Sequence, residues 1–487
     1  MSVELAALEG RARAAIAVGD WSSAAAAFEA VAGLRPEESR AWANLARARI
    51  RGGGDAGPAL RRALALDPGA AALLELACGA SPDLDDLRWS WLACIDPARP
   101  LAAKVMGARL QKGGRADVAR ELFARAVALD PEDVDAMVNL ALSEIELGHR
   151  AAAERRLDDA LARDPQEPRA RYARGWMRLA RRDWSGYADY DMRWRVPDHD
   201  ARSHAIPAPL WEGGAIESGH LALTAQFGVG DEILFAGLVP AAVRRWGGPA
   251  VLEADPRLVP LFARSFPDVT VVDRSDPPAP VLVRGAAAQS ALPRLPVLVG
   301  PGTDGFTAPA AYLTPDPDRV AWWRDRLSAL GPAPYTGLCW RSGNRRTGGR
   351  KSIPLEALDP VLLALGGTTV SLQYDPDPEE IAEVAAAGHP VPLDNPAEDI
   401  RDGLDDLAAQ IAAFDRVVTI SSVAAHLAGA LGVPGLVLMQ RDPLWFWFAD
   451  GETVPWYPSL TLLRQTGADW SNVIDEAVIR AKGFRAN

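Results

Sequence analysis

Prolines recur at a nearly fixed distance along the first 170 residues of this 487-residue chain. They close the short runs LRP, LDP, IDP, LDP and RDP at Pro36, Pro68, Pro97, Pro131 and Pro165, with spacings of 32, 29, 34 and 34 residues. A proline cannot donate a helical hydrogen bond, so each one ends a helix. A period of this length is typical of helix pairs that stack on their neighbours. The segment is therefore predicted to form a helical superhelix.

Small residues at fixed places identify the type of repeat. The best unit has the order small, small, aromatic, small, proline at Gly107, Ala119, Phe123, Ala126 and Pro131, and the next unit has Leu140, Ala141, Ala153, Leu157, Ala160 and Pro165. Such a pattern is typical of the tetratricopeptide repeat, whose concave face usually binds peptides or proteins. A helical bundle without a fixed period, or a purely structural array, is the alternative. The 29-residue unit around Trp89 and Trp91 is expected to be irregular.

Strands and helices alternate after residue 220. Strands are predicted at 221–225, 250–253, 269–272, 336–340, 368–373, 417–420 and 436–439. Alternation of this kind predicts parallel sheets with helices on both faces and ligands at the carboxyl ends of the strands. A proline-rich break near 306–334 divides the region into two halves, and a tryptophan-rich segment at 176–211 is predicted to pack as a rigid joint. The predicted domains are 1–198, 199–310 and 311–487.

A strand, helix, strand unit at 415–440 is the most informative candidate site. The β-branched run ends at Ser421 and Ser422, and a helical pattern containing His426 begins at once. Both serines are good helix caps, and a helix start offers N–H groups and a positive dipole end to an anion. His426 lies one turn inside the helix on the face of Ser422. Phosphate binding is the sharper interpretation, and an ordinary buried unit with capping serines is the alternative.

Two further motifs follow predicted strands. Five basic residues fall within eleven positions among glycines, and these are Arg341, Arg345, Arg346, Arg350 and Lys351. Guanidinium groups pair with phosphate oxygens, although a solvated loop would look similar. The other motif is GVGD, in which Gly228 and Gly230 permit a tight turn into a helix near Asp231. An acidic cap on an ordinary helix is the alternative for Asp231.

The unit at 415–440, together with the tryptophan-rich run and PWYP turn at 445–465, resembles the donor-site region of GT-B glycosyltransferases. The resemblance is specifically to heptosyltransferase-like bacterial enzymes with tetratricopeptide repeats in front, which carry similar YDMRWR and PLWEG joints. The resemblance covers nearly the whole chain. It implies an α plus α/β protein, in which a repeat superhelix precedes a GT-B fold of two Rossmann-like, doubly wound domains.

The resemblance also implies roles for individual residues. Asp231 would be the base that takes the proton of the acceptor hydroxyl. The donor would be bound by Gly228, Gly230, Arg341, Ser342, Asn344, Arg345, Lys351, Gln373, Ser421, Ser422 and His426. The family usually has an aspartate where this chain has Ser421. That departure would suit a different donor or mark weaker catalysis. No metal and no other cofactor is expected.

The function implied is an inverting glycosyltransferase that moves a sugar from a nucleotide-sugar to a hydroxyl of a protein held by the repeats. Bacterial flagellin glycosyltransferases share this layout, which suggests flagellin Ser/Thr as acceptor and a CMP-activated nonulosonic acid as donor. A glycan- or lipid-directed enzyme, or a non-catalytic scaffold with a degenerate GT-B domain, is the alternative.

Composition restricts the partners and the compartment. A net charge of −12 argues against nucleic-acid binding, which requires a basic face. Three widely spaced cysteines argue against a disulfide framework and indicate a reducing compartment. Neither a signal-peptide pattern nor an apolar run of about 18 residues is apparent, so a cytoplasmic protein is expected.

Overall fold

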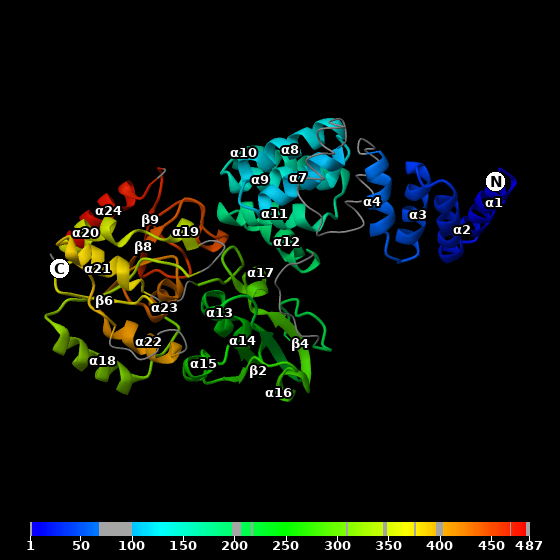
Figure 1. Ribbon diagram of the computed structural model, residues 1–487. Helices are drawn as coiled ribbons and strands as arrows, with labels where there is room; N and C mark the ends of the chain where they lie inside the picture. Colours follow the sequence, from blue (N-terminus) through cyan, green and yellow to red (C-terminus); the bar gives the residue numbers. More distant parts are fainter. Residues whose placement is uncertain are drawn as a thin grey trace. The chain divides into compact units, whose positions relative to one another are not determined.

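The computed structural model describes residues 2–67, 100–196, 206–215, 218–307, 310–343, 348–374, 376–395, 403–467 and 469–483. These residues form two compact units, Met1–Ala170 and Arg171–Asn487 (Figure 1). In the described part of the chain no helix is long and apolar enough to cross a membrane.

The first unit consists of antiparallel helix pairs. The helices among its described residues are α1 (Ser2–Ala17), α2 (Trp21–Leu34), α3 (Ser39–Arg51), α4 (Gly57–Leu66), α7 (Pro100–Lys112), α8 (Ala116–Leu129), α9 (Val134–Glu146) and α10 (Arg150–Arg163). Pro36, Pro131 and Pro165 each follow a helix end by two residues. A Cβ added at Gly107 would lie 2.8 Å from the Phe123 ring, which explains the small and aromatic positions of the repeat. The predicted irregular unit around Trp89 and Trp91 lies outside the described residues.

The tryptophan-rich joint packs with the second unit. Helix α11 (Pro168–Ala180) is followed by η1 (Trp184–Gly186), α12 (Tyr187–Tyr190) and η2 (Asp191–Arg195). The buried carboxylate of Asp189 accepts hydrogen bonds from Arg171 at 2.9 Å and Arg174 at 2.8 Å. The ring of Trp445 lies 5.5 Å from that of Tyr190, centroid to centroid, and 6.5 Å from that of Phe235. Aromatic contacts therefore connect the joint to the helix that carries Asp231.

We expect Gly175→Ala to destabilise the protein by about 1–3 kcal/mol, because overpacking forces neighbouring groups to move. A Cβ at Gly175 would clash with the Tyr190 nitrogen and lie 2.7 Å from the Gly186 oxygen. Gly33→Ala in α2 is the matched control, since a Cβ there meets no atom within 4 Å. Alanine should stabilise that helix by up to about 1 kcal/mol. Urea unfolding followed by circular dichroism measures both, and equal effects would contradict the prediction.

The first sheet has four parallel strands in the order β3-β2-β1-β4. The strands are β1 (His220–Thr224), β2 (Ala250–Ala254), β3 (Val269–Asp273) and β4 (Ala286–Ala291), and the helices are α13 (Val229–Ala236), α14 (Val239–Trp246), α15 (Val259–Ser265), α16 (Pro280–Val283) and α17 (Leu295–Val299). Leu221 and Leu252 face the main core, which contains residues of α13 to α15. Ala222 and Val251 face a smaller cluster with Leu282 of α16. Both faces are thus covered.

The second sheet has five parallel strands in the order β6-β5-β7-β8-β9. They are β5 (Tyr335–Cys339), β6 (Thr368–Ser371), β7 (Arg416–Ile420), β8 (Gly435–Met439) and β9 (Leu460–Arg464). The helices and turns are α18 (Pro317–Leu330), α19 (Gly348–Lys351), η4 (Leu355–Leu358), α20 (Asp359–Leu365), α21 (Pro378–Ala386), α22 (Leu404–Ala413), α23 (Val423–Leu431), η5 (Trp445–Trp447) and α24 (Ser471–Gly483). Figure 1 shows α18 and α22 on one side of the sheet and α20 and α24 on the other.

All seven predicted strands are confirmed, and no strand end differs from its predicted position by more than two residues. The parallel pairing and the helices on both faces are confirmed as well. Two strands, β4 and β9, were not predicted from the sequence.

Candidate functional site

A cavity of about 460 Å³ brings most of the predicted site residues together. It lies between the start of α13 and the carboxyl ends of strands in the second sheet. The predicted residues that line it are Gly228, Gly230, Asp231, Arg341, Ser342, Lys351, Ser421, Ser422 and His426. Asn344 and Arg345 lie outside the described residues. Gln373 does not line the cavity.

Asp231 is the third residue of α13, and its carboxylate is attracted by the charge of Lys351, another residue of the cavity lining. The N–H of Gly228, the cap residue, donates to its carboxylate, and this bond and the charge of Lys351 favour the ionised form. Burial outweighs both and raises the pKa of Asp231 from 3.8 to about 6. Phe227, which immediately precedes the cap residue Gly228, has a φ of 67°, a left-handed value that bulky residues rarely adopt. A carboxylate with this pKa suits general-base catalysis near neutral pH.

Gly230 lies at a close contact between the two halves, beside the cavity. Helix α13 packs on α23. A Cβ added at Gly230 would lie 3.0 Å from Cδ2 and 3.3 Å from Nε2 of His426. The second glycine of GVGD is therefore required for this approach, and not only for the turn that the sequence suggested.

A chain of hydrogen bonds fixes the protonation of His426. Its Nδ1 lies 2.8 Å from the Tyr457 hydroxyl, Tyr457 bonds to Tyr312, and Tyr312 donates to the carbonyl of Ile233 at 2.7 Å. A carbonyl oxygen can only accept, so the Tyr312 hydroxyl donates its proton to Ile233. The Tyr457 hydroxyl must then donate to the Tyr312 oxygen, and Nδ1 of His426 must donate to the Tyr457 oxygen. We call His426, Tyr457 and Tyr312 the tyrosine relay. It leaves Nε2 of His426 as an acceptor.

His426 is neutral at physiological pH, because burial and the nearby charge of Lys351 lower its pKa to about 3. It does not supply positive charge to a phosphate. Its place on the face of Ser422 suits a hydroxyl of a ligand, which can donate to Nε2.

The basic residues that line the cavity differ in whether an acidic side chain already binds them. Arg341 donates to Asp377 at 3.2 Å and to Glu380 at 3.1 Å, and Arg257 donates to Asp255 at 2.8 Å. Lys351 has no hydrogen-bonded acid in the described part of the chain. Burial lowers the pKa of its half-buried ammonium group, and the nearby charge of Asp231 acts in the opposite direction. Lys351 is therefore the described cation most available to an anion, whereas Arg341 would have to share its charge.

The alternative reading, in which capping serine side chains close the start of α23, does not match the structure. Ser422 occupies the cap position, but its hydroxyl bonds to Thr419 at 3.0 Å and makes no capping bond. Ser421 instead donates to Gln440 at 3.0 Å. The serine hydroxyls bond to side chains at the ends of β7 and β8 and not to the N–H groups of α23. As a result, no side chain of the described residues caps the first turn of α23, which stays open to an anion.

Gln373 acts behind the cavity wall. Its amide oxygen accepts from the Arg341 N–H at 3.0 Å, and its amide nitrogen donates to the Arg341 carbonyl at 3.1 Å. Both polar atoms are thereby occupied, so a direct donor contact by Gln373 is not what the geometry favours. The residue instead holds the backbone where the basic loop begins.

The sequence interpretation missed several lining residues. Arg257 follows the carboxyl end of β2, a position that could have indicated it. The others are mainly apolar, namely Val229, Cys339, Gly343, Leu372, Tyr374, Leu404, Leu407, Val423, Ala424, Leu444 and Phe446. Apolar lining residues carry no signal in a sequence that distinguishes them from core residues.

Glu232 anchors the helix that presents Asp231. Its buried carboxylate accepts from the N–H of Asp255 at 2.8 Å and pairs with Arg274. Arg274 also donates to Asp255 at 3.2 Å. This network ties α13 to the ends of β2 and β3, so the position of Asp231 depends on buried charges that are paired.

Comparison with known proteins identifies the chain's relatives. Tetratricopeptide repeat models match residues 10–71 and 110–177, which confirms the repeat prediction. Protein FlbA of Caulobacter vibrioides is 31% identical over 518 residues, covering 96% of this chain and 83% of FlbA. The chain belongs to the FlbA family.

Two solved structures each match about a third of this FlbA-family chain. A crystal structure of MamA protein is 18% identical with a TM-score of 0.31, and covers 34% of this chain and 95% of MamA. YrrB, a TPR protein with an unusual peptide-binding site, is 19% identical with a TM-score of 0.29, and covers 33% of this chain and 87% of YrrB. Neither TM-score reaches the range that supports a shared fold.

Proposed function

We propose that this FlbA-family protein is a GT-B glycosyltransferase that moves a sugar from a nucleotide-sugar to a hydroxyl acceptor. The observation that carries the proposal is the shared cavity. In it, Asp231 from the first parallel-sheet half and Lys351 and the open start of α23 from the second half meet around one space. A general base opposite an anion site is what glycosyl transfer from a nucleotide-sugar needs.

The reaction follows from the roles these groups can take. Lys351 and the first-turn N–H groups of α23 hold the donor phosphate and stabilise the charge that builds on it as the bond to the anomeric carbon breaks. The acceptor oxygen forms the new bond from the opposite face, so the anomeric centre inverts. Its proton passes to the Asp231 carboxylate, and the nucleotide leaves as the anion. Nε2 of His426 accepts a hydrogen bond from a hydroxyl of the sugar or the acceptor.

The repeats favour a protein acceptor, because tetratricopeptide arrays commonly bind peptides or proteins. Flagellin Ser/Thr and a CMP-activated nonulosonic acid, in the cytoplasm, are the acceptor and donor that the family resemblance suggests. Metal independence is part of the proposal, and Lys351 would supply the positive charge that a metal provides elsewhere.

Transfer is expected to depend on pH through Asp231. A base must be ionised to accept a proton, so kcat/KM should fall about tenfold per pH unit below the pKa of about 6 and level off above it. A pH profile of initial rates between pH 4.5 and 8 measures this limb. A profile that is flat through pH 6 would contradict the assignment of the base.

Intact mass spectrometry of flagellin co-expressed with the full chain tests the function as a whole. We expect flagellin to gain the mass of one or more sugars, and to gain none when Asp231→Asn replaces the native chain. A sugar gained by a glycan or lipid fraction instead would support the glycan- or lipid-directed alternative. No sugar on any fraction, with a folded chain, would support the scaffold alternative.

A further inference from the structure

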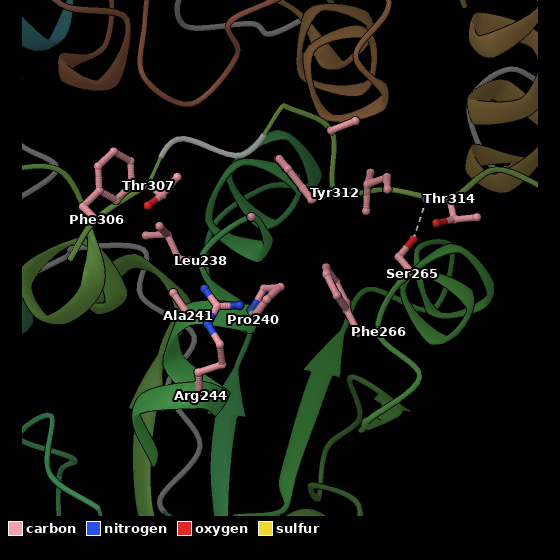
Figure 2. Close-up of a pocket in the computed structure, with 13 residues that line it drawn as sticks. Leu238, Pro240, Ala241, Arg244, Ser265, Phe266, Phe306, Thr307, Tyr312 and Thr314 are labelled. Carbon is pink, nitrogen blue, oxygen red and sulfur yellow. Dashed lines mark hydrogen bonds between the residues drawn. The ribbon is translucent and has the colours of Figure 1, made fainter. Parts of the chain in front are cut away.

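A second cavity, of about 570 Å³, is lined in part by residues 306–307 and 311–314, which belong to the segment that joins the two sheet halves. Figure 2 shows Phe306, Thr307, Tyr312 and Thr314 of that segment on one side and Pro240, Ala241 and Arg244 of α14 on the other. We call it the linker cavity. Its residues are Gly237, Leu238, Pro240, Ala241, Arg244, Ser265, Phe266, Phe306, Thr307, Ala311, Tyr312, Leu313 and Thr314.

The lining combines apolar walls with one charge. Leu238, Phe266, Phe306 and Tyr312 contribute apolar side chains, and Arg244, which is exposed, is the one charged residue of the lining. In the described part of the chain the Arg244 guanidinium has no acid or carbonyl partner. A cavity of this size with one cation suits a small ligand that has an apolar body and an anionic group.

The walls are held in place around the space. Tyr312 and Leu313 donate their N–H groups to the Ala430 carbonyl of α23 at 2.9 and 3.1 Å. The backbone N–H of Thr314 donates to the Ser265 hydroxyl at 2.9 Å, a bond drawn in Figure 2. A Cβ at Gly237 would lie 2.8 Å from the Tyr312 ring, so that glycine lets the ring pack against the end of α13.

Tyr312 connects the linker cavity to the candidate site. Its ring lines the linker cavity, while its hydroxyl belongs to the tyrosine relay that ends at His426, a residue of the site cavity. The same hydroxyl donates to Ile233 in α13, the helix of Asp231. A ligand that moves the Tyr312 ring must therefore change hydrogen bonds that orient both site helices.

We propose that the linker cavity is a second ligand site for a small amphipathic anion, and that Tyr312 and Tyr457 communicate its occupancy to His426. The anionic group pairs with Arg244 and the apolar body packs between Phe266, Phe306 and Tyr312. This inference does not require the proposed glycosyl transfer, because both binding and communication are measurable without a donor or an acceptor.

Binding is tested with 8-anilinonaphthalene-1-sulfonate, an aromatic sulfonate, by calorimetry on the full chain. We expect one saturable site, weakened about tenfold or more in Arg244→Gln, since a charge-assisted hydrogen bond is lost. Ala241→Trp, which fills the linker cavity, should abolish binding of the probe. Arg284→Gln is the matched control, because it removes the same charge from an exposed arginine of the same half. Lys351→Met should leave binding intact.

Two results would overturn the binding site. One is probe affinity that is unchanged in both Arg244→Gln and Ala241→Trp, with melting temperatures showing that the variants fold. The other is affinity that is lost in Lys351→Met, which would place the probe in the site cavity.

Communication is tested by nitrogen NMR of ¹⁵N-histidine-labelled chain, with the His426 signals assigned by His426→Gln. We expect saturating probe to shift the ring nitrogens of His426 in the native chain. Tyr312→Phe keeps the cavity wall and removes the relay, so the probe should still bind without moving those signals. Signals that do not move in the native chain at saturation would overturn the communication.

Discussion

Asp231→Asn is expected to lower the rate of sugar transfer by about 10²–10⁴-fold, the usual contribution of a general base. Asparagine keeps the size and the hydrogen bond of the side chain but cannot accept the proton of the acceptor hydroxyl. The measurement is the initial rate of transfer at saturating donor. Asp318→Asn, in the first turn of α18, is the matched control because it is an exposed aspartate near a helix start.

The same substitution is expected to stabilise the fold, which separates a catalytic from a structural role. Burial raises the pKa of Asp231 from 3.8 to about 6, so the folded chain binds more protons than the unfolded chain between these values. Stability therefore falls as the pH rises through about 6. At pH 8 the asparagine variant should be more stable by about 1–3 kcal/mol, and at pH 4 this advantage should disappear.

Urea unfolding at both pH values measures that difference. Native transfer rates in Asp231→Asn would rule out its role as base. A loss of activity accompanied by a loss of stability at pH 8 would show that Asp231 is needed for the fold and not for the proton transfer.

Lys351→Met is expected to weaken binding of the donor nucleotide by about 10–100-fold. A charge-assisted hydrogen bond to phosphate contributes about 1.5–3 kcal/mol, and methionine retains the apolar stem of the side chain. Isothermal calorimetry measures the affinity. Lys482→Met is the matched control, because it removes an exposed lysine in α24, one of only four lysines in the chain. Equal affinity in the native and Lys351→Met chains would contradict the assignment.

Local sequence patterns predicted most of the fold. The proline period and the alternation of strands and helices depend on short-range chemistry, so their prediction needed no knowledge of contacts. Strand β4 (Ala286–Ala291) was missed because AAAQSA has no β-branched residue, and its pairing with β1 stabilises it instead. Strand β9 (Leu460–Arg464) was missed because it directly follows the PWYP turn, and pairing with β8 places it at the sheet edge.

The positions of the site residues were predictable, but their interactions were not. Motifs that follow parallel strands converge at the carboxyl ends, which is why Asp231, Lys351 and Ser422 line one cavity. The partners of these motifs lie far away in the sequence. Arg341 pairs with Asp377 and Glu380, and His426 owes its tautomer to Tyr457 and Tyr312. Because such contacts arise only from the tertiary fold, the sequence could not predict that Arg341 is paired with acids or that the serine hydroxyls bond to Thr419 and Gln440.

Calorimetric titration of the purified chain with CMP, UDP, GDP and ADP, and with sugar conjugates of each, tests most directly whether the shared cavity is a nucleotide-sugar site. We expect one nucleotide to bind the native chain and Asp231→Asn equally well, and to bind Lys351→Met about 10–100-fold more weakly. Failure of every nucleotide to bind a folded sample would contradict the proposed function and support a scaffold.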